Sequence, residues 1–301
     1  MIWSFIDQHH ARFGVEPLCR FFKVATSAWY RHSARKNNPA LRCQRDKRDD
    51  LLMADIQRVW DENHQVYGAQ KVWKALNREG VRVARCTVER LMKRLGLRGV
   101  RRGKQVVTTS QDPGVKTPGD LVNRHFKASR PNQLWVSDFT YVSTRQGFIY
   151  VAFVIDVFAR RIVGWKASRS MTSEFVLDAL KQALCDRQPT PETLVHHSDR
   201  GSQYLSICYT EQLAENGISP SVGSKGDSYD NALAETINGL YKTEVIRHKG
   251  PWQGLKSVEM ATLNWVSWFN EKRLLSSIGY IPPAEAEENF YKRQAEQADE
   301  V

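Results

Sequence analysis

The sequence contains few cysteines and no long apolar run. Its five cysteines are scattered along 301 residues, at Cys19, Cys43, Cys86, Cys185 and Cys208. This spacing excludes a disulfide framework and a cysteine-rich zinc site, and it favours a reducing compartment. No stretch approaches the roughly 20 consecutive apolar residues of a membrane span, and Asp7, His9 and His10 interrupt the apolar core that a secretory signal needs. We therefore expect a cytoplasmic protein with no membrane partner.

Acidic residues are scarce in the first part of the chain. The formal net charge of the whole sequence is +11, but it is divided unevenly. Residues 1–131 contain 27 Lys and Arg against 12 Asp and Glu, a balance of +15, whereas residues 132–301 contain 17 against 21, a balance of −4. Such an asymmetry indicates a half that binds a polyanion, joined to a half with another task. A solvated basic surface is the alternative.

Two helical units account for most of the basic part. Residues 1–45 contain three short segments with helical spacing, the last of them basic. Residues 50–98 repeat this pattern, with helices expected at Leu51–Asn63, Ala69–Glu79 and Cys86–Leu95. Three short helices with a basic last member are typical of helix-turn-helix units, although small helical bundles do other work as well.

The last helix of the second unit carries a row of basic side chains. They are Arg85, Arg90, Lys93 and Arg94. Such a row suits DNA phosphates, with a merely solvated helix face as the alternative. Residues 99–131 follow without periodicity and are rich in turn residues and positive charge. We expect them to form a basic linker that can track a nucleic-acid backbone.

From residue 132 the pattern changes to strands, and the predicted order over residues 132–245 is βββαβαβα. The strands are expected at Leu134–Val142, Phe148–Val157, Arg161–Ala167, Thr193–His197 and Ile218–Val222. Short turns allow the first three strands to form an antiparallel meander, and a right-handed crossover returns the fourth strand beside the first. The predicted fold class is therefore α/β with a mixed sheet, followed by a helical extension over residues 246–301.

Three acids lie where this topology brings them together. Asp138 is inside the first strand, Asp199 follows the fourth strand, and Glu235 is on the next helix. A buried acid is costly unless it is neutralised, and a metal ion is one means of neutralising it. Carboxylates without cysteine suit Mg²⁺ or Mn²⁺, and two such ions could activate a nucleophile and stabilise the leaving oxygen of a phosphodiester. Taken singly, each acid has a structural alternative, and Asp156 in the second strand is assigned to structure.

The helix of Glu235 is predicted to have one polar face, with Asp230 as its N-cap. The side chains at spacings of four, three and four are Asn231, Glu235, Asn238 and Lys242. The apolar side chains expected to pack are Leu233, Ile237 and Leu240. One face would thus present a carboxylate with a lysine two turns further on.

Four motifs carry a family resemblance that extends through nearly the whole chain. They are Trp135-Val-Ser-Asp-Phe-Thr-Tyr-Val, Val154-Ile-Asp-Val-Phe-Ala-Arg-Arg, His197-Ser-Asp-Arg-Gly-Ser-Gln-Tyr and Lys225-Gly-Asp-Ser-Tyr-Asp-Asn-Ala-Leu-Ala-Glu. Residues 132–245 resemble the ribonuclease H-like catalytic domain of D-D-E transposases and retroviral integrases. More narrowly, the chain resembles the large-frame product of a two-frame group of bacterial insertion sequences. Asp199 and Glu235 have 35 residues between them, which is this family's spacing.

The resemblance implies a DNA transposase that binds insertion-sequence ends and catalyses metal-dependent strand cleavage and strand transfer. Asp138, Asp199 and Glu235 would be the catalytic metal ligands for two Mg²⁺ or Mn²⁺ ions, and Lys242 would contact DNA near them. The implied partners are double-stranded DNA, a second copy of the chain on that DNA, and the upstream-frame product of the same element.

Two other functions remain open from the residues alone. A ribonuclease H-like nuclease shares the fold, but the N-terminal helical units are superfluous to it. A DNA-binding regulator with an inactive core is the second, and the three intact acids disfavour it.

Overall fold

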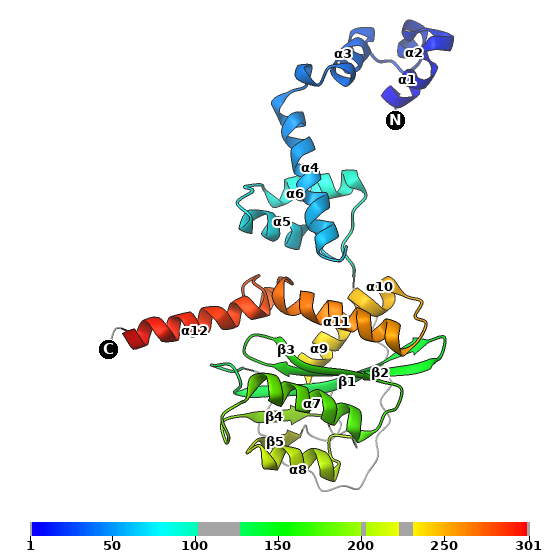
Figure 1. The fold of residues 1–301 in the computed structure, drawn as a ribbon. Helices are drawn as coiled ribbons and strands as arrows, with labels where there is room; N and C mark the ends of the chain where they lie inside the picture. Colours follow the sequence, from blue (N-terminus) through cyan, green and yellow to red (C-terminus); the bar gives the residue numbers. More distant parts are fainter. Residues whose placement is uncertain (1, 102–126, 200–202, 223–230, 300–301) are drawn as a thin grey trace.

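The N-terminal hundred residues are helical. A computed structural model describes residues 2–101, 127–199, 203–222 and 231–299 of the chain. The helices before residue 101 are α1 (Ile2–Phe13), α2 (Val15–Phe21), α3 (Thr26–Asn37), the short 3₁₀ turn η1 (Pro39–Leu41), α4 (Gln44–Glu62), α5 (Ala69–Arg78) and α6 (Arg85–Leu95). In Figure 1, α1–α3 form a small bundle at the far end of the molecule, and α4 runs from it into a second bundle with α5 and α6.

Each bundle packs around apolar side chains. The first is built from Ile6, Leu18, Cys19 and Trp29. The second includes Ile56, Val72, Leu76, Val88 and Leu91. Helix α4 begins at Gln44, so the predicted start at Leu51 is wrong. The added turns have no apolar periodicity, but their Asp49 is held by an ion pair with Arg90 of α6 at 2.8 Å, a tertiary contact that helical spacing cannot reveal.

A five-stranded mixed sheet forms the second half of the molecule. Its elements are β1 (Leu134–Thr144), β2 (Gly147–Asp156), β3 (Arg161–Ser168), α7 (Ser173–Arg187), β4 (Val195–Ser198), α8 (Ile207–Glu215), β5 (Ser219–Val222) and α9 (Ala232–Tyr241). The strand order is β3-β2-β1-β4-β5; β1–β3 pair antiparallel, whereas β4 is parallel to both β1 and β5. The predicted α/β class with a ribonuclease H-like mixed sheet is therefore confirmed.

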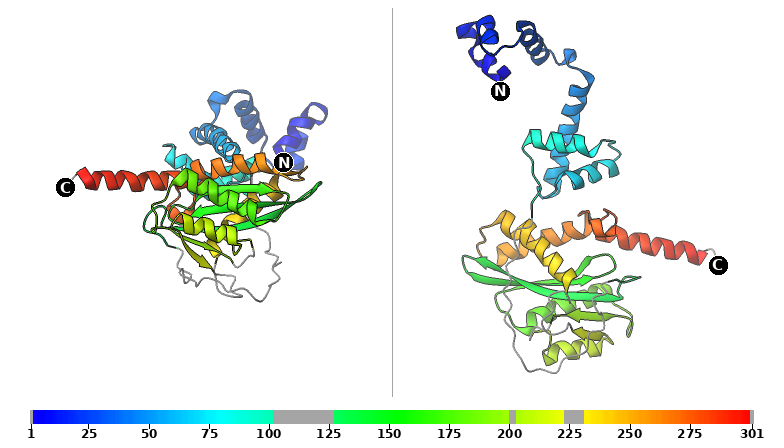
Figure 2. Two further views of the ribbon diagram at one scale, coloured as in Figure 1. Left: turned by 60° about the horizontal axis from the view of Figure 1, so that its bottom comes forward. Right: turned by 180° about the vertical axis from the view of Figure 1, so that it is seen from behind.

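Helices cover both faces of this sheet. Figure 2 shows α7 and α8 on one face, with α9 and α11 (Leu255–Glu271) on the other. Successive side chains of a strand point to opposite faces of the sheet. Trp135 therefore packs with α7 and α8, while Val136 packs with α9 and α11. Helix α7 lies so close to β3 that a Cβ on Gly164 would come within 2.2 Å of the backbone oxygen of Ala179.

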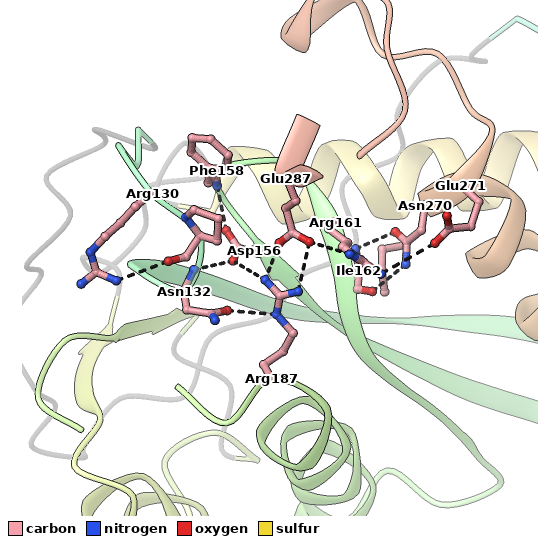
Figure 3. Close-up of polar contacts among 11 residues, drawn as sticks. Arg130, Asn132, Asp156, Phe158, Arg161, Ile162, Arg187, Asn270, Glu271 and Glu287 are labelled. Carbon is pink, nitrogen blue, oxygen red and sulfur yellow. Dashed lines mark hydrogen bonds and ion pairs between the residues drawn. The ribbon is translucent and has the colours of Figure 1, made fainter. Parts of the chain in front are cut away.

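The chain after α9 is helical and is anchored to the sheet by buried charges. It comprises the π-helical turn η2 (Lys242–Ile246), α10 (Arg247–Lys249), α11, η3 (Ser276–Ile278) and α12 (Pro283–Asp299). Figure 3 shows Glu287 of α12 between Arg161 and Arg187, whose guanidinium nitrogens lie 2.5 and 3.0 Å from its Oε2. Beyond this anchor α12 is exposed and extends away from the sheet (Figure 1).

The second helical bundle docks onto the C-terminal segment of the sheet domain. The buried Tyr67 hydroxyl accepts a hydrogen bond from the Leu274 N–H at 2.8 Å and donates one to the Lys272 carbonyl at 3.4 Å. Beside it, Trp268 donates from its indole nitrogen to Asn63 at 3.2 Å. One apolar cluster continues across this contact, so the two parts share a core.

The cysteines are free, with Cys19 buried and the other four exposed. Among the helices described, none combines the length and apolar character that crossing a membrane requires.

Candidate active site

The first predicted acid lies on the central strand of the sheet. Val136 and Thr140, two residues to either side of Asp138 on β1, are buried. The Asp138 carboxylate accepts hydrogen bonds from the Phe139 backbone N–H and the Asn238 side-chain amide, both at 2.8 Å. Burial and the negative charge of Asp199 nevertheless raise the pKa of Asp138 to about 7. Among the described residues, burial and neighbouring negative charge therefore outweigh the two hydrogen bonds that this carboxylate accepts.

Strand β4 brings the second acid beside the first. Because β1 and β4 are parallel neighbours with Ser137 paired to Ser198, the residues that follow each of them lie side by side. The charge of Asp199 raises the pKa of Asp138 and also that of Glu235. The structure thus brings the three predicted acids into one electrostatic cluster.

The third acid, Glu235, lies in the first turn of α9. The N-cap of this helix is Asn231, whose side-chain amide donates to the Ser137 carbonyl at 2.8 Å and ties the helix start to β1. The predicted N-cap, Asp230, is therefore wrong, and that residue lies outside the described ranges. Burial and the charge of Asp199 raise the pKa of Glu235.

Helix α9 packs on a broader face than the one predicted. Its buried side chains are Ala234, Ile237, Asn238 and Tyr241. Leu233 and Leu240, which the sequence assigned to packing, are half-buried and lie against the same core. Asn238, predicted on the polar face, is buried instead and donates its amide to Asp138.

The donor set fits a hard divalent cation. Burial, and then the charge of Asp199, raises the pKa values of Asp138 and Glu235, and a bound cation would lower both. The side-chain oxygens of Asn231 and Asn238 are buried nearby and have no hydrogen-bond partner in the described structure, so they are available to cation-bound water. Within the described ranges, no three His, Cys, Asp or Glu side chains lie close enough together to hold a metal ion as they stand. The acids therefore converge without making a preformed cage.

The fourth predicted active-site residue, Lys242, opens the π-helical turn η2 that continues α9. Its Nζ lies over the ring of Tyr141 on β1, 5.3 Å from the centroid. Tyr141 is 44% exposed, so this lysine lies at the surface end of the strand that carries Asp138.

The basic row lies in the second helical bundle, at a distance in the chain and in the fold from the acids (Figure 1). Arg85, Lys93 and Arg94 on α6 are exposed. Arg90 is also exposed but bonds to the buried Asp49, and this bond lowers the pKa of Asp49.

A basic cleft adjoins this row, between α4 and α6. Its volume is about 770 Å³. The arginines that line it are Arg45, Arg48, Arg82 and Arg90. Sequence reasoning singled out only the last of them, because the other three belong to α4 and to a turn, and tertiary packing alone brings them together.

Comparison with protein families gives separate matches for the second helical bundle and for the sheet domain. Residues 47–105 match a family described as an HTH-like domain, and residues 128–228 and 216–283 match models described as an integrase core domain. A helix-turn-helix-like unit joined to an integrase core defines the class of D-D-E polynucleotidyl transferases, which act on DNA and use divalent metal ions.

Individual relatives show which group within this class the chain resembles. The chain is 57% identical to a transposase of the insertion sequence IS629 from Shigella sonnei, over 95% of each chain. It is 52% identical to a putative transposase of IS986/IS6110 from Mycobacterium tuberculosis, over 90% of this chain and 97% of the relative. A solved structure of the HTLV-2 integrase catalytic core in complex with magnesium aligns with a TM-score of 0.43 and 18% identity, over 53% of this chain and 98% of that one. The chain belongs to the family of insertion-sequence transposases.

Proposed function

We propose that this transposase uses Asp138, Asp199 and Glu235 to bind two Mg²⁺ or Mn²⁺ ions, cuts DNA at the ends of its element and joins the liberated 3′-hydroxyl to target DNA. The observation that supports this most is the convergence of three acids from β1, the end of β4 and α9. Burial, and then the negative charge of Asp199, raises the pKa of Asp138 to about 7. Cations at this point would offset the repulsion between these carboxylates.

Each side chain has its own task in this proposal. When bound, the ions supply activation of the attacking oxygen and stabilisation of the leaving oxygen. Asp138 provides a ligand from a rigid central strand, and the Asn238 amide keeps that carboxylate oriented. Asn231 ties the start of α9 to β1, which keeps Glu235 in register with Asp138. Lys242 would contact a DNA phosphate at the surface end of the site.

The α6 row and the adjoining arginine cleft are proposed to bind the element ends. Arg85, Lys93 and Arg94 are exposed on one helix, and the cleft beside it is lined by arginines from α4 and the turn before α6. Guanidinium groups bind phosphate with bidentate geometry. This surface suits the DNA backbone more than single bases.

The remaining assignments are proposals of the same kind. We divide the chain into helix-turn-helix-like units at residues 1–45 and 50–98, a linker at 99–131, a catalytic domain at 132–245 and an extension at 246–301. A second copy of the chain and the upstream-frame product are proposed partners, because two element ends must be brought together. A cytoplasmic location goes with this task.

The catalytic proposal is tested with labelled duplexes that carry an element end and Mn²⁺ as the added metal. Asp138→Asn and Glu235→Gln should each reduce cleavage and strand transfer by roughly 10³-fold, since a metal site contributes several kcal/mol to the barrier. Glu211→Gln, an exposed acid on α8, is the control and should match the wild type. The metal-free melting temperature of Asp138→Asn should equal or exceed that of the wild type because the amide removes a repelled charge. Activity preserved in the folded Asp138→Asn protein would contradict the assignment.

The DNA-binding proposal is tested through the salt dependence of end binding. Each phosphate contact that is lost should reduce the slope of log K against log salt by about 1. Arg45→Ala with Arg48→Ala should therefore flatten the slope, whereas Lys181→Ala on α7 should not. An unchanged slope in the double variant would remove the cleft from the DNA-binding surface.

A further inference from the structure

Tyr204 is the one buried tyrosine in the described structure whose hydroxyl has no hydrogen-bond partner. The other three buried tyrosines are all bonded: Tyr67 to the Leu274 N–H, Tyr209 to His196 Nε2 at 3.1 Å and Tyr241 to Thr262 Oγ1 at 2.6 Å. Tyr204 itself is 3% exposed, so water cannot supply the missing bond from the surface.

The ring of Tyr204 packs in the layer of α7 and α8, against the strand that carries Asp138. It packs edge-on against Tyr209, with centroids 5.4 Å apart, and against Phe139 at 6.2 Å. Phe139 is the residue after Asp138, and Tyr204 lies five residues after Asp199. Burial, and then the charges of Asp138, Tyr209 and Asp199, raise the pKa of Tyr204 well above its ordinary value. The hydroxyl therefore stays protonated and lies within electrostatic reach of both acids.

A buried hydroxyl without a partner destabilises a fold, and phenylalanine would fill the same space without that cost. The packing of the ring thus explains an aromatic residue at this position but not the oxygen. Two other unpartnered buried atoms, the side-chain oxygens of Asn231 and Asn238, belong to residues that contact the Asp138 strand. Tyr204, Asn231 and Asn238 thus place three unpartnered polar atoms beside the strand that carries Asp138.

We propose that the Tyr204 hydroxyl is a positioning donor of the catalytic centre, which donates its hydrogen bond toward the Asp138–Asp199 pair when that pair binds divalent cations. The bond orients the carboxylates as ligands, and it compensates in the loaded protein for the desolvation that the hydroxyl suffers in the metal-free one. This inference rests on the proposed roles of Asp138 and Asp199.

The test compares Tyr204→Phe with Tyr209→Phe in the full chain, since each removes one buried hydroxyl and retains the ring. Without metal, Tyr204→Phe should melt at or above the wild-type temperature because no hydrogen bond is lost. Tyr209→Phe should melt lower, by roughly 2–4 °C, because its hydroxyl is bonded to His196.

Metal dependence then gives a readout that a structural role would not change. For Tyr204→Phe, the Mn²⁺ concentration that gives half of the thermal stabilisation should rise about tenfold, and kcat for strand cleavage should fall about tenfold, with the Kd for an element end unchanged. Tyr209→Phe should retain the wild-type Mn²⁺ dependence.

Two results would overturn the inference. The first is a metal-free melting temperature of Tyr204→Phe as low as that of Tyr209→Phe, which would make the hydroxyl structural. The second is wild-type Mn²⁺ dependence and kcat. If Tyr204→Phe behaves as wild type while Asp138→Asn is inactive, only this inference fails. If Asp138→Asn remains active, the proposed function fails with it.

Discussion

The buried ion pair between Glu244 and Arg273 links the end of α9 to the docked helical bundle. Glu244 lies in the π-helical turn that continues α9, and it is 6% exposed while Arg273 is 3% exposed. Arg273 Nε lies 3.0 and 3.2 Å from the two carboxylate oxygens, its Nη2 also bonds to Oε1, and Trp265 Nε1 donates to Glu244 at 3.1 Å. The next residue, Leu274, bonds to Tyr67 of the docked bundle.

Glu244→Gln removes the negative charge and nearly preserves the shape of the side chain. Arg273 would remain buried without its counter-charge, and burial together with Arg273 already lowers the pKa of the neighbouring Lys71 to about 7. Removing one partner of a buried pair costs about 3–5 kcal/mol. At roughly 2–4 °C per kcal/mol, the melting temperature should fall by about 6–20 °C.

Adding Arg273→Met to Glu244→Gln should restore much of this loss, because removal of both charges of a buried pair is often close to neutral. The assay is urea unfolding of the metal-free chain followed by tryptophan fluorescence, since Trp265 and Trp268 adjoin the pair. Glu211→Gln is the control. A single variant within about 1 kcal/mol of the wild type, or a double variant as unstable as the single one, would refute this account of the ion pair.

Three further predictions concern the sheet domain. Burial lowers the pKa of His196 to about 3. As the pH falls, the unfolded chain therefore binds a proton at this histidine before the folded chain does. The free energy of unfolding should fall as the pH drops from about 6.5 toward 3, by up to about 1.4 kcal/mol per pH unit. Urea midpoints at pH 7, 6 and 5 should show a smaller slope for His196→Gln than for the wild type. Glu287→Gln removes the negative charge that pairs with Arg161 and Arg187, of which Arg161 is partly exposed. It should lower the free energy of unfolding, measured by urea unfolding, by roughly 2–3 kcal/mol. Gly164→Ala forces a Cβ against the Ala179 carbonyl and should lower stability by about 1–3 kcal/mol, measured as a lower melting temperature; an unchanged value would mean that α7 shifts freely.

The strands and the proximity of the three acids could be predicted because strand patterns are local signals. The predicted strands over residues 134–222 agree with β1–β5 to within about two residues at each end. The parallel pairing of β1 with β4 follows from the handedness of crossovers, and this pairing places Asp199 beside Asp138. Asp156, assigned to structure from the sequence, indeed accepts the backbone N–H groups of Asn132 and Phe158.

Features that depend on contacts between distant segments were missed. The first turns of α4 are held by the Asp49–Arg90 ion pair and leave no trace in the apolar periodicity. The face of α9 that packs inward includes the polar Asn238, because its amide is compensated by a carboxylate 100 residues away in the chain. A prediction that places every polar residue of a helix on its exposed face cannot foresee this hydrogen bond between Asn238 and Asp138.

The sequence by itself indicated the strands, the pairing of the first strand with the fourth, the family and three candidate acids, because strand alternation, turn residues and motif spacing are local features of the chain. Only the tertiary structure decided which arginines share a cleft, how Tyr67 joins the helical bundle to the C-terminal segment, and which buried polar atoms have no partner. Whether a buried polar atom has a hydrogen-bond partner depends on all the groups that packing brings around it. For that reason the hydroxyl of Tyr204 becomes informative only in the folded molecule.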